Sequence, residues 1–357
     1  MTQVMEWFEL AVPVIQAPMG GGPSTPELAT AVSDAGGLGS IAAGYLQPDE
    51  IRRQISQVRT ATDRPFLVNM FVVEESPVAA DGARENAAAL LAGLRAEVGL
   101  PEHDVDPPAM PSVAEQFPVI LDAAPAAVSF TFGLPPPEWV AALADAGCRT
   151  VATATTVAEA AAAEQLGVDA ICVQGLEAGA HSGAHRDDAP PRRSTSALLT
   201  ECREALSTPL IAAGGIMDGR GVAAAIVQGA SAAQMGTAFL LCPEAGTAQP
   251  HRHALMRDRD ASSDTALVRT LTGRWARGIP NRLVAETSVI EGIGYPELHL
   301  MTSALRKAAA RQGRHDLMAL WAGDLYRLAE PRPAAEIITG IGDTLARVLA
   351  GWGRPRA

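Results

Sequence analysis

Lysine is almost absent from this 357-residue sequence, since Lys307 is the only one. A Walker A phosphate loop and a Schiff-base lysine on a barrel strand each require a lysine at a fixed place, so both are excluded. Cysteine is also sparse, and the four residues lie 24 or more positions apart with no Cys-x-x-Cys pair. This spacing predicts neither a zinc knuckle nor a disulfide framework. We expect four reduced, mostly buried thiols, at Cys148, Cys172, Cys202 and Cys242.

Positive charge and long apolar runs are lacking as well. The 28 Lys and Arg residues against 40 Asp and Glu residues give a net charge of −12, which would repel nucleic acid and anionic membrane surfaces. No apolar run approaches the roughly 18 residues of a spanning helix, and residues 1–6 lack the basic start of a signal peptide. The sequence therefore predicts a cytoplasmic protein with a small-molecule ligand and no nucleic-acid or membrane partner. The sequence is compatible with a homo-oligomer.

Aromatic residues make up only 4% of the sequence, although 48% of it is hydrophobic. The apolar mass is therefore Ala, Val, Leu and Ile, which is typical of helices packed on a buried sheet. In a recurring unit, a small residue and Gly close a helix and an apolar run follows. Because Gly readily takes the left-handed conformation after a helix, this unit indicates the βα repeat of a parallel sheet. It occurs at Ala35-Gly36, Ala146-Gly147, Leu166-Gly167 and Gln228-Gly229.

Eight apolar runs read as buried strands with helices between them, which favours an α/β fold of the (β/α)8 TIM barrel type over a doubly wound sheet. The runs are 14–17, 38–42, 66–69, 127–131, 150–154, 170–174, 209–212 and 232–235. Two segments do not follow the repeat. We predict an insertion at about 74–118 after the third strand, with a helix at 84–98. We also predict a helical extension over 244–357, without buried strands, that packs on the face of a barrel formed by 1–243.

Polar residues and glycines follow these runs, at the strand ends where parallel barrels build their ligand sites. They are Gln16 with residues 18–22, Asn69, Thr131, Gln174, Gly214-Gly215, and Gln234 with Gly236-Thr237. Such neutral groups suit a flat heteroaromatic ligand with a phosphate. The glycines after the last two strands predict the phosphate site, because bare backbone amides can approach its oxygens; the alternative is that they serve only tight turns. A G-x-G-x-x-A match at 37–42 is rejected because it enters a strand instead of following one.

The strongest candidate for chemistry is His181, in a Gly-rich loop after the sixth strand. A histidine can both give and take a proton near neutral pH. Glu177, His181 and His185 are spaced four apart, but Gly179 and Gly183 argue against the helix that a metal site of this spacing needs, so no metal is predicted. A basic run could clamp an anion, but we expect each member to pair with acidic neighbours instead. This run contains Arg269, Arg274, Arg277 and Arg282.

Taken together, these segments resemble the nitronate monooxygenases, formerly called 2-nitropropane dioxygenases. The similar segments are PVIQAPMGGG at 13–22, AGGLG at 35–39, VNMFV at 68–72, EAGAH at 177–181, AAGGI at 212–216, QMGTAF at 234–239, TGRWARG at 272–278 and LWAG at 320–323. The resemblance implies an FMN-dependent TIM barrel, a flavoprotein oxidoreductase that oxidises alkyl nitronates or nitroalkanes with O2 to a carbonyl compound and nitrite.

By motif match, the resemblance also implies functional residues. His181 matches the catalytic histidine, which takes the α-proton of a nitroalkane or binds the nitronate anion while FMN accepts one electron. The implied FMN-binding residues are Ala17, Pro18, Met19, Asn69, Gln174, Gly179, Gly214, Gly215, Gln234, Met235, Gly236 and Thr237. Three positions depart from the family pattern: Ala180 stands where Gly is usual, and Thr272 and Trp275 stand where Ser and Pro are more frequent.

Three alternatives share part of this pattern. An FMN-dependent NAD(P)H reductase acting on a quinone or an enoyl thioester has similar flavin glycines. A purine-nucleotide dehydrogenase barrel needs a loop cysteine as nucleophile, whereas Cys242 lies in an apolar run. A catalytically inactive barrel that binds a phosphate ligand would make His181 dispensable.

Overall fold

The computed structural model describes residues 2–73, 79, 81–102, 109–257 and 264–352. Eight parallel strands form one sheet in the order β1, β9, β8, β6, β5, β4, β3, β2. A bridge between Ile15 and Leu38 joins the two edges, where Gln16 N donates to Leu38 O at 2.9 Å. The sheet is therefore a closed barrel, as predicted. Its strands are β1 (Val14–Gln16), β2 (Gly39–Ala42), β3 (Phe66–Phe71), β4 (Ala127–Thr131), β5 (Arg149–Ala154), β6 (Ala170–Gln174), β8 (Leu210–Ala213) and β9 (Ala232–Met235).

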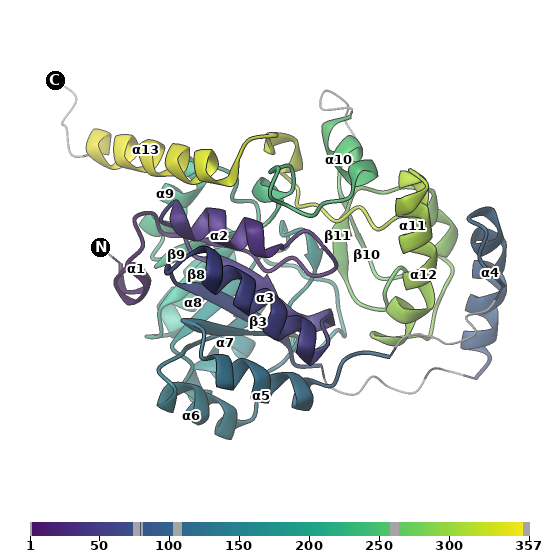
Figure 1. The fold of residues 1–357 in the computed structure, drawn as a ribbon, viewed down its shortest axis with the longest axis horizontal. Helices are drawn as coiled ribbons and strands as arrows, with labels where there is room; N and C mark the ends of the chain where they lie inside the picture. The colour runs from purple at the N-terminus through teal and green to yellow at the C-terminus, as the bar shows by residue number, and fades with distance from the viewer. Residues whose placement is uncertain (1, 74–78, 80, 103–108, 258–263, 353–357) are drawn as a thin grey trace.

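Helices surround this barrel (Figure 1), and polar side chains fix where several of them begin. Thr25, Thr156, Ser194 and Asp218 each accept a hydrogen bond from a backbone N–H in the first turn of their helix. The helices between the strands are α2 (Pro26–Asp34), α3 (Pro48–Ala61), α5 (Val113–Ala123), α6 (Pro137–Asp145), α7 (Val157–Leu166), α8 (Thr195–Ala205) and α9 (Gly219–Val227).

The last helix of the chain, α13 (Ala334–Trp352), packs against α9 and α2 (Figure 1). Ile337, Ile338 and Ile341 are buried in the same apolar cluster as Val222 of α9 and Leu28 of α2. The outer layer beside β9 and β1 is thus completed by a helix about 100 residues beyond β9. The domain boundary at Pro243 stays a prediction.

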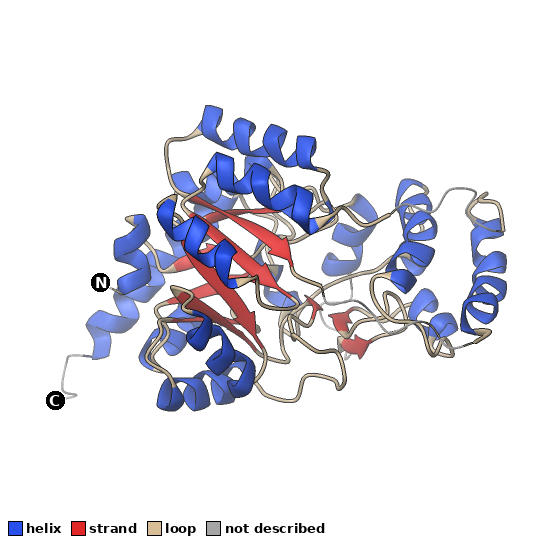
Figure 2. Ribbon diagram, turned by 90° about the horizontal axis from the view of Figure 1, so that it is seen from below, coloured by secondary structure: helices blue, strands red, loops and turns tan. Residues whose placement is uncertain are grey.

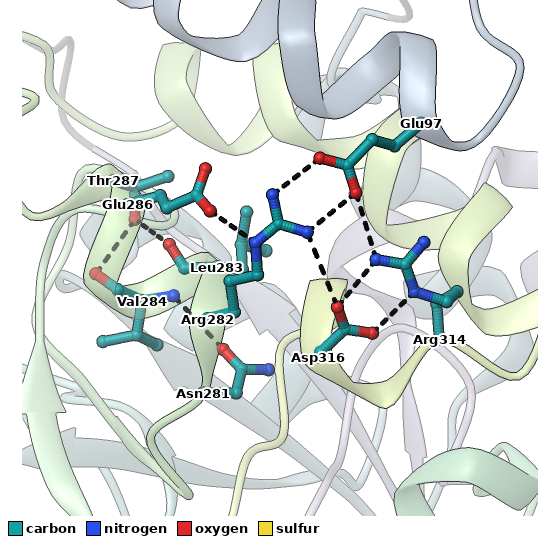
Figure 3. A network of polar contacts seen from close by, with 9 residues as sticks. All are labelled: Glu97, Asn281, Arg282, Leu283, Val284, Glu286, Thr287, Arg314 and Asp316. Carbon is teal, nitrogen blue, oxygen red and sulfur yellow. Dashed lines mark hydrogen bonds and ion pairs between the residues drawn. The ribbon is translucent and has the colours of Figure 1, made fainter.

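The predicted insertion contributes α4 (Ala83–Glu97), which lies apart from the barrel beside α12 (Glu297–Arg311) in Figure 1. Leu91 and Leu94 are buried in a cluster with Leu305 and Leu317. At the C-terminal end of α4, Glu97 pairs with Arg282 and Arg314 at 2.6 and 3.2 Å (Figure 3). These contacts fasten α4 to the C-terminal part of the chain. The remainder of the predicted insertion includes 74–78, 80 and 103–108, which lie outside the described residues, and the start of α5.

A second, three-stranded antiparallel sheet lies where the barrel strands point (Figure 2). It consists of β10 (Ala266–Val268), β11 (Ala276–Gly278) and β7 (Ala180–His181). All three residues of β11 are buried, so the prediction that residues 244–357 contain no buried strand is wrong. The strand was not predicted because it is only three residues long and its central residue is Arg277. A charged residue interrupts the apolar run by which a buried strand is recognised in a sequence.

The remaining helices are α1 (Gln3–Phe8), α10 (Gln249–Met256), α11 (Arg282–Thr287) and four 3₁₀ turns at Ala43–Tyr45, Thr237–Phe239, His315–Leu317 and Tyr326–Leu328. Across the described ranges, we find no helix that is both long enough and apolar enough to cross a membrane.

Candidate active site

A cavity of about 890 Å³ opens at the carboxyl ends of the barrel strands and extends beneath α12. This volume falls in the range of about 300–1,000 Å³ typical of cofactor and substrate sites. Each residue predicted to bind the cofactor lines it, as does His181: Ala17, Pro18, Met19, Asn69, Gln174, Gly179, Gly214, Gly215, Gln234, Met235, Gly236 and Thr237. Gln16 does not line it. Its fully buried amide serves the barrel, accepting from Ser40 N and donating to Ser24 Oγ, both at 2.8 Å.

Asn69 presents a buried acceptor without a partner. Its Nδ2 donates to Ser129 Oγ at 2.9 Å and to Thr131 Oγ1 at 3.0 Å. These bonds fix the amide at the end of β3 and leave Oδ1 with no partner among the described groups. A buried unpaired acceptor is costly, so this atom is suited to an N–H or O–H of a bound molecule.

Glycines from four loops line one lobe of the cavity. Gly214 and Gly215 follow β8 with φ values of +116° and +66°. A Cβ at Gly179 would lie 2.5 Å from the backbone N of Gly323, and this N–H donates to Thr237 Oγ1 at 3.0 Å. Position 179 therefore needs glycine because its loop packs directly against the backbone at Gly323. Gly323 was not predicted for the site, although it belongs to one of the segments that carry the family resemblance.

His181 lies on β7, and both its backbone and its side chain are held by neighbouring residues. Its backbone pairs with Ala276 of β11, and its Nε2 lies 2.9 Å from Thr272 Oγ1. The side chain of Gln174 spans the turn, donating from Nε2 to His181 O at 3.3 Å and accepting from Gly183 N at 2.6 Å. Thr272, one of the departures from the family pattern, thus contacts the predicted catalytic side chain.

The surroundings of His181 keep its imidazole neutral. The ring contacts Phe132, Tyr295 and Trp321, with centroids 5.9, 5.6 and 5.5 Å away. Burial among these rings lowers the pKa of His181 to about 3, and the positive charges of Arg274 and Arg306 contribute further. A neutral imidazole can donate a hydrogen bond to an anion. A pKa this low makes it a weak base, so its uptake of a proton depends on an anion beside it that stabilises the imidazolium.

Arg274 fixes the segment that follows His181. Its guanidinium lies 4.1 Å from the ring centroid of Phe132 and donates to the backbone oxygens of Ser182 and Ala184. Phe132 has a φ of +78°, which is strained for a bulky side chain. The strain occurs beside the catalytic candidate and is held in place by the arginine.

Ala180 keeps the backbone conformation that glycine favours, with a φ of +61°. The left-handed region costs an L-residue with a Cβ about 1 kcal/mol. We therefore expect Ala180→Gly to raise the free energy of unfolding by about 1 kcal/mol without moving His181, as measured by urea unfolding. Ala178→Gly, in the same loop but outside the left-handed region, is the control and is expected to lower stability slightly because glycine gains entropy on unfolding. If both substitutions changed the free energy of unfolding by the same amount, the proposed strain at Ala180 would be contradicted.

The other candidates from the sequence make protein contacts. Glu177 Oε2 accepts from Thr195 N and Oγ1 at 2.9 Å, and His185 Nε2 lies 2.9 Å from Thr153 O. Within the described residues, no three His, Cys, Asp or Glu side chains are grouped as a metal site. Arg277 pairs with Asp324 at 2.6 Å and Arg269 with Asp187 at 2.9 Å. Arg282 pairs with Glu97 (Figure 3).

The four cysteines are free and buried. Burial raises the pKa of the Cys242 thiol to about 12, the opposite of what a thiolate nucleophile requires. This opposes the purine-nucleotide dehydrogenase alternative.

Besides Gly323 and the aromatic residues around His181, the sequence also did not predict Tyr45, His299 and Arg306 for the site. Tyr45 comes from the 3₁₀ turn after β2, and the other two from α12; all three line the cavity. The rings of Tyr45 and His299 are stacked 4.7 Å apart. No local pattern marks these residues, because α12 reaches the barrel only through tertiary packing.

Comparisons with known proteins agree on one family. The family model described as nitronate monooxygenase matches residues 2–343. A protein named nitronate monooxygenase from Pseudomonas aeruginosa is 44% identical over 351 residues, covering 93% of this chain and 96% of that protein. A probable nitronate monooxygenase from Bacillus subtilis is 39% identical over 337 residues, covering 92% of this chain and 94% of that protein.

Solved structures give the same fold. A nitroalkane oxidase from Streptomyces ansochromogenes superposes with a TM-score of 0.92 at 41% identity, covering 98% of this chain and 99% of that one. FabK from Thermotoga maritima superposes with a TM-score of 0.77 at 26% identity, covering 99% and 98%.

Proposed function

This chain belongs to the nitronate monooxygenase family, and we propose that its cavity binds FMN and oxidises alkyl nitronates with O2 to a carbonyl compound and nitrite. The observation that carries the proposal is the position of His181, neutral and surrounded by aromatic rings, in the cavity lined by the glycine loops. A carboxylate at this position would repel a nitronate anion, whereas a neutral imidazole can donate a hydrogen bond to it.

The residues present fit FMN. We assign the phosphate to the backbone amides around Gly215 and Thr237, together with that of Gly179, and a polar group of the flavin to Asn69 Oδ1. When bound, FMN would supply the electron acceptor for the nitronate and the route by which its electrons reach O2. The chain itself positions the substrate and excludes water with Phe132, Tyr295 and Trp321.

His181 performs the proton chemistry in this proposal. With a neutral nitroalkane, its imidazole takes the α-proton and leaves a nitronate. With a nitronate already formed, the same ring donates its N–H to an oxygen of the anion. The bond to Thr272 Oγ1 and the β7–β11 pairing hold the ring in place for either step.

The test is to incubate the purified protein with ethyl nitronate and no NAD(P)H, and to follow nitrite release together with O2 uptake. We expect both, and we expect the flavin absorbance to bleach when O2 is withheld. Absence of nitrite release from a flavin-loaded protein would contradict the proposal.

The second candidate is an FMN-dependent NAD(P)H reductase, favoured by the 26% identity to FabK across nearly the whole chain. The same preparation decides between the two functions. Oxidation of NADH with a quinone or an enoyl thioester, faster than nitrite release from the nitronate, would favour the reductase.

The phosphate assignment predicts that Gly215→Val lowers the FMN content of the purified protein several-fold. A Cβ at this position lies 3.2 Å from Glu177 Cβ at a φ of +66°, so a branched side chain crowds the loop that carries the amides. Gly147→Val is the matched control, because Gly147 has a φ of +78°, follows α6 and has no atom within 4 Å of an added Cβ. Flavin content per folded protein, measured by absorbance, should fall only in the first variant; full occupancy in Gly215→Val would contradict the assignment.

A further inference from the structure

Arg306 is a half-buried cation for which no carboxylate partner is found among the described residues. It projects from α12 into the cavity, where its Nε donates to Thr302 Oγ1 at 3.1 Å and its Nη2 donates to His299 O at 3.0 Å and to His299 Nδ1 at 3.2 Å. Among the described residues, we find no acidic side chain that pairs with it and no acceptor for Nη1. Burial lowers the pKa of Arg306, but a guanidinium keeps its charge in proteins.

The hydrogen bond from Arg306 also fixes the tautomer of His299. A guanidinium can only donate, so His299 Nδ1 is the acceptor of their bond and the imidazole proton lies on Nε2. The stacked ring of Tyr45, 4.7 Å away and nearly parallel, fixes the plane of His299. Burial and the charge of Arg306 lower the pKa of His299 to about 2, so the side chain is a neutral N–H donor.

We propose that Arg306 and His299 together bind a negatively charged oxygen group of the substrate in this cavity. A guanidinium that lines a cavity and has no counterion there attracts an anionic ligand, to which its N–H groups can donate charge-assisted hydrogen bonds. The donors left over, Arg306 Nη1 and His299 Nε2, can each donate to an oxygen of such an anion. Both belong to α12, whereas the glycines assigned to the FMN phosphate come from other elements that line the same cavity.

The identification of the bound anion as part of a nitronate rests on the proposed function. The anion site itself is inferred independently of that function. Both His181 and His299 contact Tyr295, at 5.6 and 5.8 Å between ring centroids. An anion on Arg306 and His299 therefore shares the cavity with His181, and its binding should compete with that of the substrate.

The test uses nitrate, an unreactive planar oxyanion, with the flavin-loaded enzyme. Its Kd is read from the change in flavin absorbance, and its competition from the KM of ethyl nitronate. We expect Arg306→Met to raise the Kd of nitrate by about tenfold or more, as for a lost charge-assisted hydrogen bond. Arg311→Met, which removes an exposed charge from the same helix, should change the Kd less than twofold.

His299 is tested by two substitutions. His299→Phe keeps a ring against Tyr45 and removes the donor, so the Kd of nitrate should rise by about fivefold. His299→Asn keeps a donor and should recover part of that loss. Flavin content and the unfolding midpoint of each variant verify that it is folded.

The outcomes separate this inference from the proposed function. Failure of nitrate to bind the wild-type enzyme would overturn the anion site, as would equal Kd values for folded Arg306→Met and Arg311→Met. Nitrate binding that depends on Arg306, in an enzyme that releases no nitrite from nitronates, would uphold the anion site and reject the proposed substrate.

Discussion

Replacing His181 by Asn is expected to lower kcat/KM for a neutral nitroalkane by about 10²–10⁴-fold, the usual range for a lost general base. The asparagine keeps a polar group near Thr272 Oγ1 but cannot take the α-proton. FMN content should not change, because the assigned phosphate and flavin contacts are backbone amides and the Asn69 side chain, and the substitution alters only the side chain of His181. Initial rates of nitrite release and the flavin absorbance of the same preparation measure both effects.

The two roles of His181 separate when the substrate is supplied as a nitronate, whose proton has already been removed. If the imidazole acts mainly as a base, His181→Asn should lose far less activity with ethyl nitronate than with nitroethane. If it mainly binds the anion, KM for the nitronate should rise.

His185→Asn is the matched control, because His185 binds the backbone oxygen of Thr153 and is not assigned to the reaction. It should keep kcat/KM within about threefold of the wild-type value. Undiminished nitroalkane turnover by flavin-loaded His181→Asn would remove His181 from the mechanism and favour a role in binding alone.

The sequence predicts the barrel and much of its site because both depend on short-range patterns. Three strands have the predicted bounds: Ala127–Thr131, Ala170–Gln174 and Ala232–Met235. Residues after such strands reach one edge of a parallel sheet whatever the rest of the chain does. This geometry is why Asn69, His181 and Gly215 line the same cavity.

The sequence does not predict the parts of the site that depend on distant packing. His299 and Arg306 lie on a helix whose sequence is ordinary, and only its docking over the barrel brings them to the cavity. The short strand β11 holds His181 through pairs formed about 95 residues away. Gln16 is a case in which the short-range pattern misleads. It ends a strand as the other candidates do, but its side chain bonds Ser24 and Ser40 and does not line the cavity.

Three histidines, one buried and two half-buried, are expected to make this protein unstable in acid. Burial lowers the pKa of His181 to about 3 and of His251 to about 4, and burial with Arg306 lowers that of His299 to about 2. The unfolded chain binds these protons near pH 6.5. Their contribution to stability is therefore complete above about pH 6.5 and is lost as the pH falls toward the folded-state values.

Each such histidine removes about 1.4 kcal/mol per pH unit between these limits, so the three together remove about 4 kcal/mol per unit. A total stability of about 5–15 kcal/mol would then be exhausted between about pH 5 and pH 3. The measurement is the free energy of unfolding in urea, at intervals from pH 7 to the acid limit of the folded state.

His251 allows this explanation to be tested outside the proposed chemistry. Its Nε2 is buried without a partner among the described groups, so the folded state has no acceptor ready for a second proton. His251→Gln should reduce the slope of stability against pH by about 1.4 kcal/mol per unit, whatever its effect at pH 7. His253→Gln, on the exposed side of the same helix, should leave the slope unchanged. Equal slopes in the two variants would mean that His251 does not contribute to the acid instability.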